Sequence, residues 1–431
     1  MTSQTASFTR AVRFWVVLGF INFGGPGAQI ALMHRELVER RKWVEDQAFN
    51  RALGFCMALP GPEAQQLAIY LGWKLHGIPG GVIAGTTFIG PSILAMIVLS
   101  WVAVAHGDVP AIAGTLFGLQ SVVVGIVADA VIRVGRRTLD GPVRLAIAVA
   151  SFGAISLVGL PFPIVIGVAA LVGLVVSRFA PHWMLSAGGP TRASGDPDPA
   201  GPSPTPGVPN RTWSVIGASL ILWIVPVGSL VLWRGPDDIL TRIALFFTRV
   251  SFVTFGGAYA VLSHVADVTV NDYKWIDAQR MVQGLGLAES TPGPLIIVTQ
   301  FVGFVAAYGQ SPGLDPLVSG VIGGLVTTWC MFLPCFLFVL AGAPFMERLT
   351  GNPIVGAALA GVTSAVVGAI ANLALYTTVH TIWPADERPD WFAITVASLT
   401  FVTLRRYSLP AYVLAPIGAV AGVVWSYVRS S

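Results

Sequence analysis

Long apolar stretches separated by short polar ones run along almost the whole chain of 431 residues. A helix needs about 20 apolar residues to cross the roughly 30 Å hydrocarbon core of a bilayer, and stretches near that length recur. They are 82–105, 111–132, 143–160, 162–178, 213–233, 317–341, 355–379, 391–404 and 409–428. In lipid every backbone polar group must be paired within its own segment, so the pattern predicts an all-α integral membrane protein with many crossings.

Four further apolar stretches are interrupted in the middle. They are 11–33, 44–76, 240–262 and 278–308. Two contain the motif FGG and two contain PGP. Proline removes a backbone donor and glycine lets the chain bend, so a helix ends at each of these places. Inside a membrane such a break is stable only where it is buried in protein or lines a watery cavity. The pattern therefore predicts discontinuous helices around a polar interior.

The interruptions recur at a fixed spacing, which indicates an internal duplication. FINFGG matches FVTFGG, KWVEDQ matches KWIDAQ, and one PGP matches the other, all at a shift of 232 positions. GLQSVVVGIVAD matches GVTSAVVGAIAN at a shift of 243. We therefore predict a first repeat at 8–178 and a second, homologous repeat at 236–428.

The two repeats are predicted to have inverted topology. Between them lies a Pro/Gly-rich segment, 179–212, whose composition predicts a flexible cytoplasmic linker, followed by an extra transmembrane helix at 213–233. One unpaired crossing turns the second copy over in the membrane. Loop charges agree, because RVGRR at 133–137 is basic whereas its counterpart ADERPD at 385–390 is mostly acidic. The positive-inside rule then places the N-terminus in the cytoplasm and the C-terminus outside.

The same rule bears on the first FGG segment, which has basic residues on both sides. Arg10 and Arg13 precede it, and Arg35, Arg40 and Arg41 follow it. If both ends are cytoplasmic, the segment is re-entrant: it enters the membrane and returns. The PGP segments can do the same. A plain crossing with an unusually basic outer loop is the alternative.

Composition agrees with a membrane protein and adds little about chemistry. Hydrophobic residues make up 54% of the chain and charged residues 11%, against about 25% charged in soluble domains. The net charge of +4 lies in short loops and does not indicate nucleic acid as a partner. Cys56, Cys330 and Cys335 lie in apolar segments without the spacing of metal ligands. We expect neither a metal nor a cofactor.

The breaks themselves suggest a binding site. A half-helix that begins at Pro62 or Pro294 presents free N–H groups and about half a positive charge, which favours an anion. In inverted repeats such ends converge near the membrane midplane. The candidate substrate-binding residues are Asn22, Gly24, Gly25, Gly61, Pro62, Gln65, Gln66, Thr254, Gly256, Gly257, Thr291, Gly293, Pro294, Thr299 and Gln300. The alternative for each polar one is that it only caps a helix or bonds a neighbouring helix.

Carboxylates inside the membrane are candidates for proton coupling, because they are costly to keep there. Glu63 and Glu289 flank the two PGP motifs, and Asp129 lies late in a predicted helix. A carboxylate beside an anion site repels the anion when ionised, so it could hold and exchange a proton. For Glu63, capping of the half-helix is an equal alternative.

The motifs FGGPGAQIALMHRELVERRKWV, LPGPEAQQLAIYLGW and FVTFGGAYAVL with ESTPGP resemble the two-domain, long-chain members of the chromate ion transporter family. The resemblance covers about 10–178 and 236–428. It implies efflux of chromate across the bacterial inner membrane, driven by the membrane potential or the proton gradient. The motif residues that it carries over are Gly24, Gly25, Pro60, Gly61, Pro62, Gly256, Gly257, Pro292, Gly293 and Pro294. Ala258 stands where the first copy has Pro26, which puts an equivalent tight break in doubt.

The residues by themselves lead to an anion transporter and no further. Chromate and sulfate are both tetrahedral dianions, so a general oxyanion carrier is an alternative, and a passive anion channel is another. A membrane enzyme or scaffold is less favoured, since the chain contains no HExxH, GxSxG or Walker A motif. A channel has no need of titrating groups such as Glu63 and Glu289. The oligomeric state is open, with a homodimer among the options.

Overall fold

The computed structural model describes residues 6–180, 208–255, 257–311, 313–345, 353–383, 388–407 and 409–430. Helices joined by short turns make up this part of the chain, and no strand occurs within it, which confirms the all-α prediction. The helices are α1 (Phe8–Ile21), α2 (Gly25–His34), α3 (Asp46–Met57), α4 (Glu63–Ala105), α5 (Pro110–Thr138), α6 (Pro142–Ser156), α7 (Phe162–Phe179), α9 (Val208–Arg234), α10 (Ile239–Val253), α11 (Ala258–Asp267), α12 (Ala278–Ser290), α13 (Val298–Gln310), α14 (Pro316–Gly342), α16 (Pro353–Ile382), α17 (Trp391–Tyr407) and α18 (Ala411–Ser430).

Seven helices in the described ranges are long and apolar enough to cross a membrane: α4, α5, α7, α9, α14, α16 and α18. The predicted spans 143–160 and 391–404 correspond to α6 and α17, which have only 15 and 17 residues. At 1.5 Å per residue they are about 22 and 26 Å long, short of the roughly 30 Å hydrocarbon core. Most of the predicted linker lies outside the described residues, and α9 covers the predicted extra helix.

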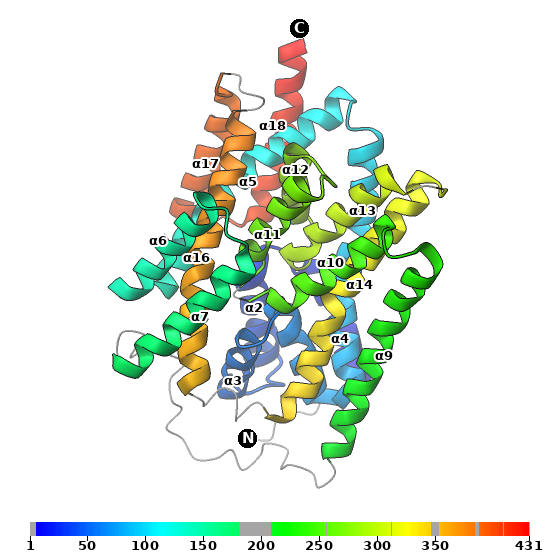
Figure 1. Cartoon of the computed structure of the whole chain (residues 1–431), viewed down its shortest axis with the longest axis vertical. Coiled ribbons are helices and arrows are strands. Elements are labelled where there is room, and N and C mark those ends of the chain that lie inside the picture. The colour runs from blue at the N-terminus through cyan, green and yellow to red at the C-terminus, as the bar shows by residue number, and fades with distance from the viewer. Residues whose placement is uncertain are drawn as a thin grey trace.

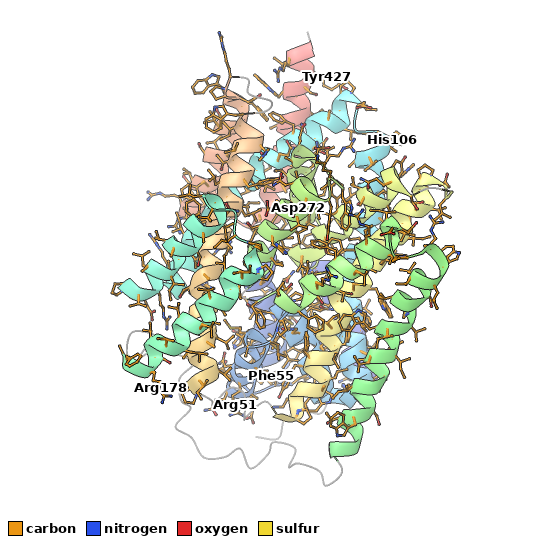
Figure 2. The ribbon with its side chains drawn as sticks, in the orientation of Figure 1. Arg51, Phe55, His106, Arg178, Asp272 and Tyr427 are labelled. Atoms are coloured by element: carbon orange, nitrogen blue, oxygen red, sulfur yellow. The ribbon has the colours of Figure 1, made fainter. Side chains whose placement is uncertain are left out.

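Apolar side chains cover the outer surface. Leu94 of α4, Leu157 after α6 and Leu232 of α9 are 69%, 84% and 90% exposed. A soluble protein rarely exposes so much contiguous apolar surface, whereas lipid tails cover it without cost. Figure 2 shows charged or polar residues toward the two ends of the long axis: Arg51 and Arg178 at the lower end, His106 and Tyr427 at the upper end.

The chain folds back on itself at the first FGG and PGP breaks. After α2 the Trp43 ring packs on Phe14 of α1, with ring centroids 5.8 Å apart. Two helices meet within α4 at His76 and Gly77, whose backbone angles are not helical. His76 Nε2 lies 2.8 Å from the carbonyl of Ala6, next to the start of α1. Both broken segments therefore begin and end at the same end of the molecule.

The corresponding segments of the second half fold in the same way. The Trp275 ring packs on Phe246 of α10 at 5.6 Å, as Trp43 packs on Phe14. Gln310 Nε2, at the end of α13, donates to the carbonyl of Lys274 before α12 at 3.2 Å. Lys42 and Lys274, at matching positions, both have φ of 53°. The two predicted repeats thus share an unusual local geometry as well as a sequence pattern.

Long helices pack across the two halves reciprocally. α5 packs against α17 and α18, and its counterpart α16 packs against α6 and α7. The contacts are close because glycines face backbone: a Cβ on Gly118 would overlap the carbonyl of Gly418, and one on Gly361 the carbonyl of Ala169. Small residues of this kind let helices approach closely in membranes. A two-fold relation between the predicted repeats would produce this pattern.

Counterpart segments also lie at opposite ends of the molecule. In Figure 1, α3 is near the lower end and its counterpart α12 near the upper end. Figure 2 labels Arg51 of α3 near the lower end and Asp272, shortly before α12, a little above the middle. An inverted pair would place its counterparts in opposite halves in this way, and the inversion stays a prediction.

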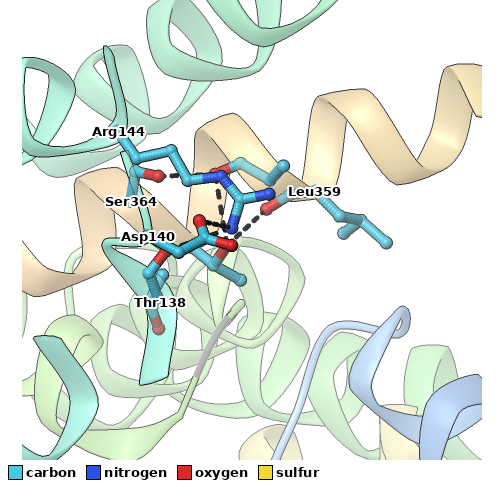
Figure 3. A network of polar contacts seen from close by, with 7 residues as sticks. Thr138, Asp140, Arg144, Leu359 and Ser364 are labelled. Carbon is cyan, nitrogen blue, oxygen red and sulfur yellow. Dashed lines mark hydrogen bonds and ion pairs between the residues drawn. The ribbon is translucent and has the colours of Figure 1, made fainter. Parts of the chain in front are cut away.

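A buried arginine fastens the α5–α6 corner. Arg144 of α6 is 9% exposed, pairs with Asp140 at 2.7 Å, and donates from Nη1 to the carbonyl of Thr138 at 3.1 Å. Figure 3 shows Leu359 and Ser364 of α16 around the same guanidinium. A buried charge is tolerated only when it is paired and hydrogen-bonded, so this corner is held firmly against α16.

The glycine contacts between the halves give a prediction about stability. Gly118→Leu and Gly361→Leu should each lower the apparent melting temperature of the detergent-purified protein, because overpacking a close helix contact costs about 1–3 kcal/mol. Gly153→Leu in α6 is the matched control, since a Cβ there meets nothing within 4 Å. Wild-type melting of both test variants would contradict the close packing.

Candidate functional site

The four breaks meet in two pairs, and each pair joins the two halves. The backbone N–H of Gly61 donates to the carbonyl of Thr254 at 2.6 Å, and that of Gly293 donates to the carbonyl of Asn22 at 3.2 Å. Each bond links the PGP loop of one half to the residue beside the FGG motif of the other half. Backbone groups that the breaks release are thereby paired.

Each PGP loop also lies against a long helix of the opposite half. A Cβ added to Gly61 would come within 2.8 Å of Cys335 Sγ in α14, and one on Gly293 would overlap Ser92 Oγ in α4. Ser92 and Cys335 are counterparts in the two repeats. Gly61 and Gly293 have φ of +127° and +108°, which other residues rarely adopt. Both positions therefore require glycine for two reasons: the backbone angle and the lack of space for a side chain.

Helices begin directly after all four breaks. Pro62 precedes α4, and Pro294 precedes a single turn that leads into α13. α2 follows Gly24, with φ of +93°, and α11 follows Gly257, with φ of +102°. No side chain of the described residues caps these helix starts. Their first N–H groups therefore have no side-chain acceptor, as an anion site would need. Gly25 lies in the same turn with φ of +75°, and Gly256 lies outside the described residues.

Four fully buried amide side chains of the first half surround these breaks: Asn22, Gln29, Gln65 and Gln66. Three of them donate to backbone carbonyls. Asn22 Nδ2 reaches Phe88 at 3.0 Å, Gln66 Nε2 reaches Pro60 at 2.6 Å, and Gln29 Nε2 reaches Asn22 at 2.7 Å and Gly293 at 2.6 Å. Because only the NH2 group can donate, the oxygen of each amide is identified by these bonds.

Five polar atoms of these amides have no hydrogen-bond partner within the described part of the chain. They are Asn22 Oδ1, Gln29 Oε1, Gln65 Nε2, Gln65 Oε1 and Gln66 Oε1. A buried polar group without a hydrogen bond costs about 1–3 kcal/mol, so such groups are rare and usually meet water or a ligand. Gln65, one turn into the helix that starts after Pro62, is the strongest case because neither end of its amide is bonded.

The candidate residues of the second half are satisfied within the protein. The hydroxyls of Thr254, Thr291 and Thr299 each donate to a carbonyl three or four residues earlier in the chain. Gln300 Nε2 donates to the carbonyl of Ile93 at 2.9 Å, and its Oε1 accepts from Thr328 Oγ1 at 3.1 Å. These contacts match the alternative stated above, in which the polar groups bond within or across helices.

The two carboxylates beside the PGP loops lie in different surroundings. Glu289 is 6% exposed, and its Oε1 accepts a hydrogen bond from the Tyr259 hydroxyl at 2.6 Å. Tyr259 follows the second FGG motif, so this bond connects α12 to α11. Glu63 is the first residue of α4, is half-buried, and makes no hydrogen bond or ion pair with any described residue. Either carboxylate can hold a proton near the breaks.

Asp129 is engaged elsewhere. It pairs with Arg133 of α5 at 3.3 Å and with Arg405 of α17 at 3.7 Å. Its counterpart Asn372 bonds Ser156 and Ser263 instead, at 2.7 and 2.8 Å. The two ion pairs connect α5 to α17, which favours a structural role for Asp129 between these helices.

Sequence reasoning missed Gln29 and Tyr259. Gln29 lies within the FGGPGAQ motif. Its amide, four residues beyond a helix break, was the signal that could have identified it as a candidate site residue. Tyr259 lies in an apolar segment where an aromatic residue is ordinary, and nothing in the sequence links it to Glu289. Within the described residues no group of three or more His, Cys, Asp or Glu side chains could hold a metal ion.

Comparison with known proteins adds the family. A family model described as chromate transporter matches residues 9–174 and 241–423. A probable chromate transport protein of Synechococcus elongatus is 29% identical over 424 residues, which cover 97% of this chain and 96% of that protein. Chromate transport proteins of Pseudomonas aeruginosa and Cupriavidus metallidurans are 29% and 27% identical, and the matches cover 96% and 86% of this chain and 91% and 82% of theirs. No solved structure matches the chain.

The PGP glycines give a prediction for the site. Gly61→Ala and Gly293→Ala should each lower the melting temperature and abolish transport, because a side chain at these backbone angles costs about 1–3 kcal/mol before any overlap is counted. Gly54→Ala in α3 is the control: a Cβ there meets nothing within 4 Å, and alanine favours the helix. If the loop variants matched Gly54→Ala in both measurements, the loops would not need this geometry.

Proposed function

The chain belongs to the chromate transporter family, and on that premise we propose that it exports chromate across the bacterial inner membrane, coupled to the proton gradient. Chromate transport proteins among its relatives support the substrate. The arrangement around the breaks supports the binding residues and the coupling to protons.

The observation that carries the proposal is the reciprocal pairing of the breaks beside unpartnered amides. Gly61 bonds Thr254 and Gly293 bonds Asn22, so each break of one half lies beside a break of the other, and a helix without a side-chain cap among the described residues begins at each. Helix N-termini attract anions through free N–H groups and the helix dipole, without a fixed positive charge. Gln65 adds an amide with no partner of its own. A tetrahedral oxyanion fits this chemistry because its oxygens accept hydrogen bonds from several directions.

Transport needs access from alternate sides, and the duplication offers a route. We propose that the halves are inverted repeats, with the N-terminus and the linker in the cytoplasm and re-entrant segments at FGG and PGP. The hairpins, the reciprocal contacts of α5 and α16, and the loop charges support this. In transporters built from inverted repeats, one repeat rocks against the other around a site near the midplane.

Proton coupling is assigned to the carboxylates beside the breaks. Glu289 is buried and bonded to Tyr259, and Glu63 stands at the start of a half-helix. Protonation of either removes a negative charge near the oxyanion, so by linkage the proton and the oxyanion would each raise the other's affinity, which couples their occupancy. Asp129, held by Arg133 and Arg405, is the weakest of the three predicted coupling residues.

Two other functions fit the same site. Sulfate has the same shape and charge as chromate, so a general oxyanion carrier would use the same helix starts. A passive channel would also accept an anion there, yet it has no need of a buried carboxylate.

The test is uptake of radiolabelled chromate into inverted membrane vesicles, with and without a proton gradient and with sulfate as competitor. Gradient-driven accumulation is expected, and Glu289→Gln should reduce it at least about tenfold because the carboxylate can no longer bind and release a proton. Glu39→Gln, at an exposed carboxylate, is the control and should transport like the wild type.

The other outcomes separate the alternatives. Equal competition by sulfate would make the protein a general oxyanion carrier. Flux that equilibrates but never accumulates would indicate a channel. No chromate flux under any gradient, with the protein correctly inserted, would overturn the transport proposal.

A further inference from the structure

We propose that the two halves of this protein divide the work of transport between them. The buried amides of the first half hold the oxyanion, and the Tyr259–Glu289 pair of the second half carries the coupling proton. This inference rests on the proposed function and makes it more specific, because the duplication by itself would suggest two equivalent sites.

The amides of the first half have no counterparts in the second. At the shift of 232 positions, Gln29 corresponds to Val261 and Gln65 to Ile297. Gln66 likewise corresponds to Val298. Every one of these second-half residues is apolar and fully buried. At these three positions, side-chain amides are therefore found in the first half only.

The hydroxyl–carboxyl pair is equally one-sided, because Glu63, the carboxylate beside the first PGP loop, has no hydroxyl partner among the described residues. Glu289 corresponds to Met57, and Tyr259 corresponds to Gly27. Neither first-half residue can hold or pass a proton. The 2.6 Å bond from the Tyr259 hydroxyl to Glu289 Oε1 therefore has no equivalent across the two-fold relation.

The hydrogen bonds of the buried polar side chains also favour an anion site in the first half. Asn22, Gln29, Gln65 and Gln66 each leave at least one polar atom unbonded although they are fully buried. The second-half residues Thr291, Thr299 and Gln300 all have partners. A buried amide that is unbonded in the protein alone is available to a ligand, whereas a bonded one must first give up its partner. Among the described candidate residues beside the breaks, the unused hydrogen-bonding capacity thus lies in the first half.

The surroundings of Glu289 suit a proton rather than an anion. The charged groups near the pair come from α5 and α17: Arg133 acts electrostatically on both Glu289 and Tyr259, and Asp129 pairs with Arg133 and, through its other oxygen, with Arg405. When a proton arrives at the Tyr259 oxygen, the hydroxyl can pass its own proton to Glu289 Oε1. The bond between the two side chains is kept in both states, so the carboxyl can be charged or neutral without moving.

One residue connects the two functions. Gln29 Nε2 donates to the carbonyl of Gly293 at 2.6 Å, in the PGP loop that begins three residues after Glu289. The same nitrogen donates to the carbonyl of Asn22, which Gly293 N–H also contacts. A change of charge at Glu289 therefore acts on a loop that the first-half amides hold. Through this contact, protonation of Glu289 would affect the amides that hold the oxyanion.

The test compares binding with coupling in two sets of variants. Binding is the rise in melting temperature of the detergent-purified protein with added chromate at fixed pH. Coupling is measured in proteoliposomes as gradient-driven chromate accumulation, next to chromate–chromate exchange without a gradient and the pH profile of exchange. Gln65→Met and Gln65→Ile remove the amide, and the second introduces the residue found at the counterpart position. Glu289→Gln and Tyr259→Phe remove the proton carrier and its partner.

Opposite losses are expected. The Gln65 variants should bind chromate about tenfold more weakly or worse, as loss of a buried hydrogen bond implies. Glu289→Gln and Tyr259→Phe should keep chromate binding within about twofold and keep exchange, while accumulation is lost and the pH profile of exchange becomes flat. Gln47→Met and Tyr407→Phe, at exposed positions, are matched controls and should behave like the wild type.

The failures are distinguishable. If the wild type accumulates chromate but Gln65→Met still binds it normally, or if Tyr259→Phe and Glu289→Gln lose binding together with accumulation, the division of labour is wrong and the proposed function stands. If the wild type neither binds nor accumulates chromate, both fall. Melting temperatures without chromate identify any variant that is merely unstable. If one of the two Gln65 variants is unstable, the other one tests whether the amide binds chromate.

Discussion

A backbone N–H or carbonyl without a partner costs several kcal/mol inside a membrane, and the four helix breaks of this chain release such groups in the interior. The breaks satisfy one another. Gly61 N–H bonds the carbonyl of Thr254 and Gly293 N–H bonds that of Asn22, so each PGP loop depends on the FGG segment of the opposite half. Three other features accompany this pairing. Glycine is required at both PGP loops, a helix begins directly after each break, and buried amides lie beside the breaks of the first half.

The pairing also means that neither half is complete alone. The partner of each PGP loop lies more than 190 positions away in the sequence, and α5 and α16 likewise pack against helices of the other half. A rocking motion between the halves must therefore keep or exchange the Gly61–Thr254 and Gly293–Asn22 bonds, since breaking both would expose unpaired backbone groups. The same constraint that stabilises the fold thus limits the motions by which a substrate could pass.

Much of the fold could be predicted from the sequence because length, hydropathy and Gly/Pro positions are local signals. They correctly indicated the long helices, and helices do end at FGG and PGP. The length of α6 was less well predicted, because apolar residues continue past Ser156 without helical structure. The site was harder. Among the described residues Gln65 has no hydrogen-bond partner, whereas Gln300 has two. This difference, like the bond between Tyr259 and Glu289, depends on which helices lie nearby. A local sequence pattern does not contain that information.

An internal duplication separates what the scaffold needs from what the chemistry needs. The PGP loops that pair with the opposite half have the same sequence in both halves: Pro60-Gly61-Pro62 in one, Pro292-Gly293-Pro294 in the other. The side chains that do not take part in that pairing differ, as Gln65 and Ile297 show. Backbone bonds constrain both copies equally, whereas an oxyanion in the interior needs only one set of side-chain donors, and a single carboxyl suffices to carry a proton. A symmetric scaffold can therefore hold an asymmetric site, and the asymmetry lets the two ligands be bound by different halves that meet at one loop, where Gln29 bonds the carbonyl of Gly293.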